Sequence, residues 1–191
     1  MKKLKLSLIL CATMLLCGCS EPAPAEYHVP EDGIARLGSR VTAEPFDQLT
    51  LLDVNDSLGK RGLYSATWTD GEAVPYENSQ GKTVDLYDAQ LTLLVSEAID
   101  ELESQENFNF WISTAEENYD ISETETVTCN QQEYTLLSYN RNDKDSPHPR
   151  GMSAFAINGK TGVCIEFTCS EDYGKDLKPI LSDFLEHCKI G

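Results

Sequence analysis

The residue types best suited to covalent chemistry lie near the amino terminus, in the segment MLLCGCS at residues 14–20. Cys17 and Cys19 are separated by one glycine, and a cysteine can ligate a metal, form a disulfide or carry a modification. A zinc site needs four ligands, and the next residues, Ser20 to Ala25, add neither cysteine nor histidine. The pattern therefore favours modification of a cysteine over metal binding.

The flanks of this segment are typical of an exported protein. Three lysines lie within the first five residues, and residues 6–17 form an uncharged stretch. A membrane-spanning helix needs about 20 apolar residues, whereas a stretch of this length is typical of a signal peptide. The motif LCGC at 16–19 resembles the bacterial lipobox. The resemblance implies a diacylglyceryl group on the sulfur of Cys19 and cleavage after Gly18.

Neither neighbouring cysteine fits this motif as well as Cys19. Cys11 and Cys17 both follow a leucine, where the residue before the cleaved bond must be small. An ordinary secretory signal that is cleaved elsewhere is the alternative. We expect lipidation at Cys19, because basic region, apolar region and small-residue site coincide. The protein is then held on a bacterial membrane by its lipid and faces the extracytoplasmic side.

Removal of residues 1–18 makes an acidic chain more acidic. It takes three of the 15 basic residues and none of the 32 acidic ones, leaving 173 residues with a formal charge of −20. Nucleic-acid binding is excluded, because it needs a basic surface that neutralises phosphates. An anionic membrane is expected to repel this composition, so the lipid on Cys19 is expected to hold the protein there.

Composition divides the mature chain into a tether and one domain. Residues 19–45 are rich in proline and acidic residues at first and show no convincing hydrophobic period, which indicates a flexible tether. Residues 46–191 have the usual length of a single domain.

The domain is expected to alternate strands, a helix, strands and a helix. A helical stripe begins at Phe108, and Asn158-Gly159 predicts a two-residue type I′ turn between two strands. Strands are predicted at 46–54, 61–69, within 83–98 (where residues 87–95 alternate), 123–129, 133–140, 151–157 and 161–169, with helices within 98–119 and at 176–190. Short turns between strands favour an α+β fold, an antiparallel sheet of about six strands flanked by helices.

The order of these elements resembles the PsbP-like α/β/α sandwich. The resemblance is carried by NQQEYTLLSYN, SAFAINGKTGVCIEFTCS and ILSDFLEHCKI, and it covers residues 46–191. It is a likeness of topology, and no functional residue follows from it. It implies a binding or assembly-accessory role.

The residues that commonly perform catalysis form no catalytic pattern. His28 lies in the tether, His148 between two prolines, and His187 beside Cys188 on a helix. Adjacent helical residues point about 100° apart, which is poor geometry for a nucleophile and its base. GMSAF at 151–155 lacks the closing glycine of a nucleophile elbow. We therefore expect no catalytic, cofactor-binding or metal-binding residues.

Two weaker binding hypotheses rest on loops. Asp143 and Asp145 could ligate Ca²⁺, but the loop lacks the ligand order of an EF-hand, so a solvated loop is preferred. Trp68 and Tyr76 flank a polar loop and could form an exposed aromatic surface for a sugar or peptide. Trp111 lies on the helical stripe with Phe108, and both are expected in the core.

Four cysteines follow the proposed anchor: Cys129, Cys164, Cys169 and Cys188. An even number outside the cytoplasm permits disulfides. If a bond exists, Cys129 with Cys164 is the expected pair, although unpaired buried thiols are equally compatible with the pattern.

Two functions are compatible with this sequence. The first is a non-catalytic binding or accessory lipoprotein with a protein or glycan partner. The second is a cell-envelope hydrolase whose active site has no recognised motif. The lack of any nucleophile–base or metal pattern favours the first.

Overall fold

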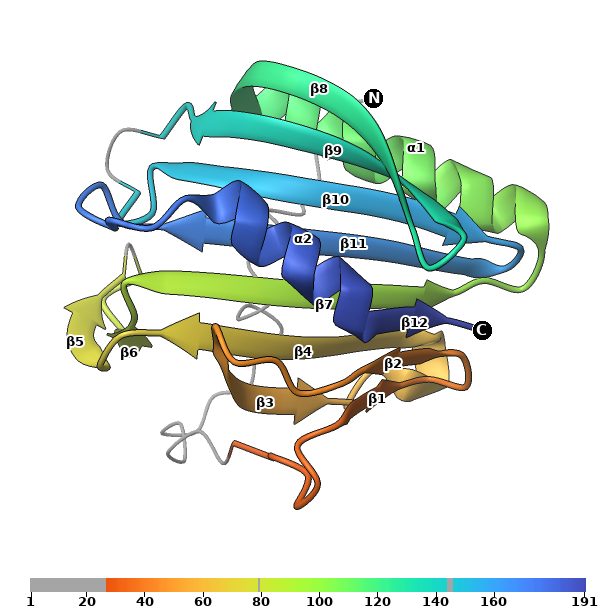
Figure 1. The fold of residues 1–191 in the computed structure, drawn as a ribbon, viewed down its shortest axis with the longest axis horizontal. Coiled ribbons are helices and arrows are strands. Elements are labelled where there is room, and N and C mark those ends of the chain that lie inside the picture. Colours follow the sequence, from red (N-terminus) through yellow and green to blue (C-terminus); the bar gives the residue numbers. More distant parts are fainter. Residues whose placement is uncertain (1–26, 79, 144–145) are drawn as a thin grey trace, which may run out of the picture.

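The computed structural model describes residues 27–78, 80–143 and 146–191, which form a layered α+β fold (Figure 1). A seven-stranded antiparallel sheet is the central layer, and one helix packs on each face. A three-stranded sheet and a two-stranded hairpin accompany it. The predicted fold class is correct in kind, whereas the prediction of about six strands undercounts the main sheet.

The main sheet has the order β3-β4-β7-β11-β10-β9-β8, and all neighbours are antiparallel. A 3-10 helix, η1 (Gly59–Arg61), connects β3 to β4, and a hairpin of β5 (Val74–Glu77) and β6 (Thr83–Leu86) connects β4 to β7. The strands of the main sheet are β3 (Thr50–Asn55), β4 (Leu63–Asp70), β7 (Ala89–Glu97), β8 (Tyr119–Cys129), β9 (Gln132–Arg141), β10 (Arg150–Asn158) and β11 (Thr161–Cys169).

Alternation along β11 separates the two faces of this sheet. Its odd-numbered residues from 163 to 169 belong to the larger core, which also contains helix α2 (Leu177–His187). Cys164 points to the other face and belongs to a smaller cluster beneath helix α1 (Glu101–Asn118). This division follows from strand geometry, because successive side chains of a strand point to opposite faces.

Helix α1 begins at a capping residue and covers the smaller cluster. The Asp100 carboxylate accepts the backbone N–H of Glu103 at 2.9 Å, which satisfies one free donor of the first turn. Ala115 is buried, and the predicted stripe residues Phe108 and Trp111 are half-buried against the same cluster. The predicted helical stripe is therefore confirmed.

Helix α2 covers the larger core. Asp176 caps it, and Pro179 lies in the first turn, where no N–H is needed. Phe184 is fully buried, with its ring centroid 4.9 Å from that of Trp68. Cys188 is buried too, but it begins strand β12 (Cys188–Ile190) and does not continue the helix.

Part of the predicted tether is folded. Strands β1 (Ala35–Leu37) and β2 (Val41–Ala43) form a small antiparallel sheet with β12. Leu37 and Val41 are 0% and 1% exposed and belong to the larger core. The prediction that the domain starts at residue 46 is therefore wrong. Strands of three residues are too short to show a period, and the strand that pairs with β2 lies at the far end of the chain.

The turn predicted at Asn158-Gly159 differs from the expectation in the two residues that occupy it and in their φ angles. Asn158 pairs with Thr161, so the turn consists of Gly159 and Lys160, and only Gly159 has a positive φ (57°). The turn with two positive φ values lies instead between β8 and β9, at Asn130 (50°) and Gln131 (65°). The Asn130 amide donates to carbonyl oxygens at the end of α2, including that of Glu186 at 2.9 Å, which holds this turn against the helix.

Candidate functional site

The most concentrated polar chemistry surrounds Glu166, in the middle of β11. This residue is 7% exposed. Its Oε1 accepts hydrogen bonds from the Tyr119 hydroxyl at 2.5 Å, the Tyr139 hydroxyl at 2.9 Å and Arg141 Nη2 at 3.2 Å. We call these four residues the Glu166 cluster. It lies on the α1 face of the sheet.

Ring packing holds the Glu166 cluster together in addition to its hydrogen bonds. The rings of Tyr119 and Tyr139 stack with centroids 4.0 Å apart, and the Arg141 guanidinium lies 5.8 Å from the centre of the Tyr119 ring. Burial, followed by the nearby charge of Glu166, raises the pKa of both tyrosines. Both hydroxyls therefore stay protonated and act as donors to the carboxylate at neutral pH.

His148 is buried beside this cluster, which corrects the expectation of a histidine in a solvated loop. It is 7% exposed. Its ring nitrogens lie 3.0 Å from Thr168 Oγ1 and 2.7 Å from the carbonyl oxygen of Tyr87. Burial lowers the pKa of His148. A neutral ring donates to the Tyr87 carbonyl and accepts from Thr168, so this histidine connects strand β11 to the segment before β7.

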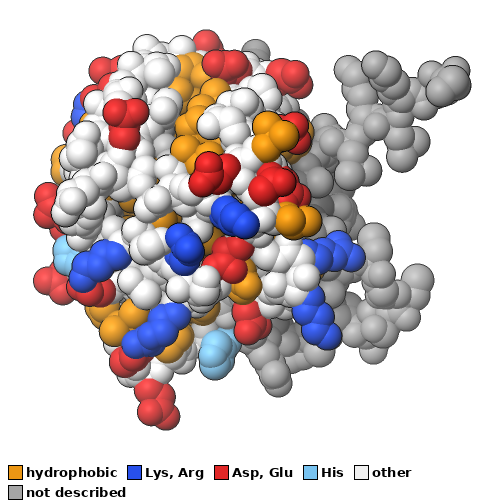
Figure 2. All heavy atoms as spheres, turned by 90° about the vertical axis from the view of Figure 1, so that its right-hand side faces the viewer, with side chains coloured by type: hydrophobic (Ala, Val, Ile, Leu, Met, Phe, Trp, Pro, Cys, Tyr) orange, Lys and Arg blue, Asp and Glu red, His pale blue; other side chains and the backbone are white. Residues whose placement is uncertain are grey.

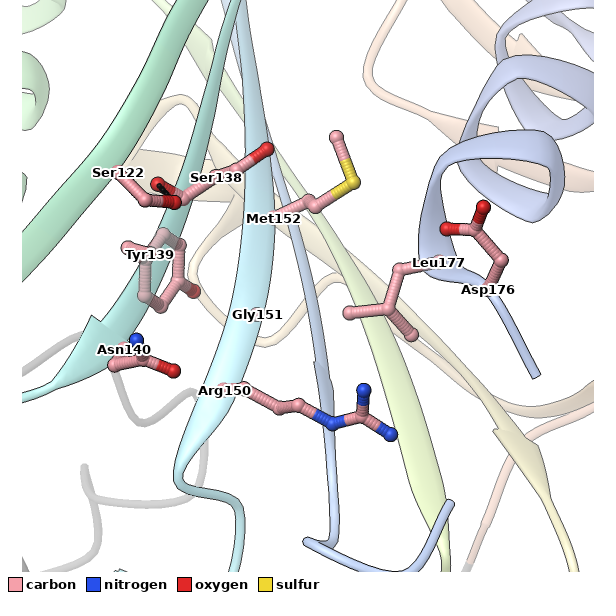
Figure 3. A pocket seen from close by; sticks show the side chains of 9 residues that line it. All are labelled: Ser122, Ser138, Tyr139, Asn140, Arg150, Gly151, Met152, Asp176 and Leu177. Atoms are coloured by element: carbon pink, nitrogen blue, oxygen red, sulfur yellow. Dashed lines mark hydrogen bonds between the residues drawn. The ribbon is translucent and has the colours of Figure 1, made fainter. Parts of the chain in front are cut away.

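A groove opens on the α2 face, between strands β8 to β10 and the first turn of α2 (Figure 3). Its volume is about 240 Å³. Met152 and Leu177 supply apolar surface, and the Arg150 guanidinium extends beneath the first turn of α2, where Asp176 lies. Its polar lining is completed by Ser122, Ser138 and Asn140. We call this hollow the α2 groove.

Arg150 is the most distinctive group of the α2 groove. Its Nη2 donates to the carbonyl oxygen of Tyr173, and its Nε is buried without a hydrogen-bond partner among the described residues. A buried N–H without an acceptor carries a cost of about 1–3 kcal/mol. A ligand oxygen or an ordered water that reaches Nε would remove this cost.

A second hollow of about 410 Å³ lies across the loop that holds Tyr173. Asp70 accepts hydrogen bonds there from the Tyr173 hydroxyl at 2.7 Å and from Lys175 at 2.5 Å. Burial alone would raise the pKa of Asp70, but the bonds from Lys175 and Tyr173 outweigh it and lower the pKa. Asp70, at the second hollow, and Arg150, at the α2 groove, lie in line across the sheet through the pairs Asp70–Ala89, Ala89–Cys169 and Cys169–Arg150, so both hollows lie at the same end of the sheet.

The predicted aromatic surface is not formed. Trp68 is 1% exposed and belongs to the larger core, so its assignment as an exposed binding residue is wrong. Trp68 lies on the buried face of β4, and the polar loop that follows it in the sequence gives no indication of this burial. Tyr76 is half-buried on β5.

The expected pairing of Cys129 with Cys164 is also wrong. Cys129 packs against the larger core on the α2 face, whereas Cys164 lies in the cluster beneath α1, on the opposite face. All four cysteines after the proposed anchor are free thiols. Burial raises the pKa of Cys188 to about 12, followed by a smaller effect of Cys129. A thiol with this pKa is unreactive at neutral pH.

Within the described residues no group of three or more His, Cys, Asp or Glu side chains could hold a metal ion. Of the two aspartates considered for Ca²⁺, Asp143 is exposed and Asp145 lies outside the described residues. His187 is half-buried, with Nδ1 2.8 Å from the Asp183 carbonyl oxygen, and His28 is exposed.

The proposed anchor, Cys19, lies outside the described residues. No helix in the ranges that the structure describes is long and apolar enough to cross a membrane.

Sequence reasoning did not single out Glu166 or Arg150. A signal for Glu166 was available, because it is the one charged residue in the otherwise apolar strand TGVCIEFTC. A charge within a strand buried on both faces needs a partner. No comparable signal marks Arg150, whose position at the groove depends on where α2 begins.

Comparison with known proteins gives no family. No family model matches the chain, and no curated protein matches it. It is similar to the solution structure of cyanobacterial PsbP from Synechocystis sp. PCC 6803, at 11% identity and a TM-score of 0.41, over 77% of this chain and 95% of that one. It is also similar to a Pseudomonas aeruginosa protein of unknown function, at 9% identity and a TM-score of 0.39, over 61% and 95% of the two chains. The first of these belongs to the PsbP-like class that the sequence was expected to resemble.

Proposed function

We propose that the chain is a lipid-anchored lipoprotein of the bacterial cell envelope that binds a protein or glycan partner and catalyses no reaction. The anchor rests on the LCGC motif at 16–19. The binding role rests on one observation: the α2 groove is open and lined by hydroxyl, amide, carboxylate and guanidinium groups over apolar surface. A few convergent polar groups over an apolar floor are typical of a ligand site.

The geometry of the polar groups favours binding over the alternative, a cell-envelope hydrolase. A nucleophilic serine needs a base within hydrogen-bonding reach, but the hydroxyl of Ser122 in the α2 groove donates to the backbone carbonyl of Ser138 at 3.1 Å. The Glu166 carboxylate, a candidate base, already accepts three hydrogen bonds on the other face. These contacts support a structural role for Glu166.

Lipidation is tested by replacing the acceptor. Cells that produce the full chain are labelled with a radioactive or clickable fatty acid. We expect label on the wild type and on Cys17→Ala, the matched control, and none on Cys19→Ala, which should accumulate as an unprocessed precursor. Label on the Cys19→Ala protein would show that the lipobox assignment is wrong.

Binding in the α2 groove is tested by site-specific crosslinking in the same cells. A photoreactive amino acid replaces Ser122, which is exposed in the groove, or Ser113, which is exposed on α1. We expect a discrete crosslinked product from position 122 and none from 113. Equal products from the two positions, or none from 122, would contradict the assignment of the groove.

A further inference from the structure

The second hollow combines an aromatic side chain with several polar ones. Its volume of about 410 Å³ falls within the range of roughly 300–1,000 Å³ that is common for ligand sites. The half-buried side chains of Tyr87 and Leu52 contribute apolar surface. The polar side chains around them include those of Asp47, Gln48, Asp70 and Lys175. An apolar surface with a few polar groups beside it is the usual composition of a small-molecule site.

Hydrogen bonds hold the Asp70 carboxylate in one position in this hollow. In addition to the bonds from Tyr173 and Lys175, its Oδ1 accepts the backbone N–H of Gly71 at 3.0 Å. The Asp70 side chain is still 24% exposed, and that of Lys175 is 56% exposed. A carboxylate and an ammonium group that lie side by side and reach the solvent offer an acceptor next to donors. Two neighbouring hydroxyls of one ligand can bond to such a pair.

The charges at the second hollow do not favour an ionic ligand. Asp47 and Asp70 are accompanied by one cation, Lys175, which is paired with Asp70. Figure 2 shows the opposite end of the sheet, where Lys and Arg side chains are interspersed with Asp and Glu in the same way. Because opposite charges lie together, we expect an uncharged ligand whose groups both donate and accept hydrogen bonds.

The sheet at the two hollows is poorly suited to binding a peptide backbone. An extended peptide is commonly bound by adding a strand to an open sheet edge. Strand β4 at the second hollow is paired on both sides, with β3 and β7, and β10 at the α2 groove is paired with β9 and β11. Recognition there falls to side chains. Sugar hydroxyls suit them, because each hydroxyl is both a donor and an acceptor.

The second hollow adjoins the α2 groove. The consecutive residues Lys175 and Asp176 line the second hollow and the α2 groove respectively. Tyr173, in the same loop, contacts a residue of each, because its hydroxyl donates to Asp70 and its carbonyl accepts from Arg150. Asp70 and Arg150 are three strand spacings apart, or about 14 Å. A ligand of a few sugar residues is long enough to occupy both.

We propose that the second hollow binds one ring of an uncharged oligosaccharide, packed against Tyr87 and bonded through its hydroxyls to Asp70 and Lys175, and that the sugar chain continues into the α2 groove. The C–H groups on the face of a sugar ring are apolar and pack on an aromatic ring, whereas the hydroxyls at its edge need polar partners. This inference rests on the proposed binding function, and it selects a glycan from the two kinds of partner.

The test is isothermal titration calorimetry with the full chain, purified in detergent from the membranes of the producing cells. The probes are three uncharged oligosaccharides, cellotetraose, maltotetraose and N-acetylated chitotetraose, with the corresponding monosaccharides and the anionic tetragalacturonate. We expect at least one uncharged tetrasaccharide to bind, more tightly than its monosaccharide and more tightly than tetragalacturonate.

Two pairs of variants locate the sugar in the second hollow. Lys175→Met should weaken the binding of that tetrasaccharide about tenfold, because it removes a hydrogen bond from a charged group. Lys178→Met is the matched control, at a paired and exposed lysine in the first turn of α2, and should have no effect. Tyr87→Ala should weaken binding at least as much, whereas Tyr76→Ala, at a half-buried tyrosine on β5, should not. Circular dichroism confirms that each variant is folded.

A further variant tests whether the ligand reaches the α2 groove. Asn140 is exposed and lines this groove, away from the second hollow. Asn140→Ala should weaken the binding of the tetrasaccharide and leave that of the monosaccharide unchanged. An equal loss for both would contradict a sugar chain that extends from one hollow to the other.

The inference is wrong if none of the three uncharged tetrasaccharides binds, if tetragalacturonate binds most tightly, or if Lys175→Met and Lys178→Met have the same effect. Its failure is distinct from failure of the proposed function. A protein crosslinked at position 122 without saccharide binding would contradict the glycan alone. Absence of fatty-acid label on wild-type Cys19 would contradict the anchor alone.

Discussion

Replacement of Glu166 by glutamine tests whether the Glu166 cluster holds the fold together. The change keeps the shape of the side chain and removes its charge. Arg141 then loses its ion pair with Glu166, and the two tyrosine hydroxyls face a neutral amide in place of a carboxylate. We therefore expect a loss of stability well above that of a surface substitution, which is usually within about 0.5 kcal/mol.

The size of this loss follows from burial. Removal of one partner from a buried ion pair costs about 3–5 kcal/mol. The Arg141 side chain is 19% exposed and that of Glu166 is 8% exposed, so water can partly solvate the guanidinium left behind. We therefore expect about 3 kcal/mol, near the lower limit. For a chain of this length that corresponds to a melting temperature roughly 6–12 °C lower.

The assay is urea unfolding followed by circular dichroism, with Glu171→Gln, at an exposed glutamate, as the control. Arg141→Met should cost less in the Glu166→Gln background than in the wild type, because the charge pair is already broken. A loss no larger than that of Glu171→Gln would refute the reasoning. So would strict additivity of the two single changes.

Two further predictions concern the turn after β10 and the buried histidine. Gly159→Ala should lower the free energy of unfolding by about 1 kcal/mol through its positive φ alone, since an added Cβ meets nothing within 4 Å; Gly174→Ala, equally open but without a positive φ, should lose nothing in the same urea titration. Burial lowers the pKa of His148, so the unfolded chain binds more protons as pH falls below about 6.5, and stability should fall there less steeply in His148→Gln than in the wild type.

The fold could be predicted from the sequence wherever a local pattern reports it. The alternation of β11 in the sequence matches the separation of Cys164 from its odd-numbered neighbours, and a period of 3.6 located the stripe of α1 from Phe108. Both patterns depend only on backbone geometry within one element. The two short strands at 35–43 gave no such signal, because their pairing with β12 depends on the rest of the fold.

The candidate sites depend on the tertiary structure to a greater extent. The donors to Glu166 come from β8 and β9, and the α2 groove exists only because α2 crosses the sheet beside Arg150. The hairpin at Gly159 was found from its residues, but which two residues occupy the turn was decided by the register of β10 on β11.

The lipobox motif and the overall acidity are properties of the sequence itself. LCGC at 16–19 is contiguous, and a net charge is a sum that no fold changes. How that charge is distributed was decided by the tertiary structure alone. From composition an anionic membrane was expected to repel the chain, and the fold places cations beside carboxylates, as in Lys189–Glu44, Lys175–Asp70 and Lys178–Glu125. Each of these pairs joins residues from different segments of the chain, so only the tertiary structure brings the opposite charges together.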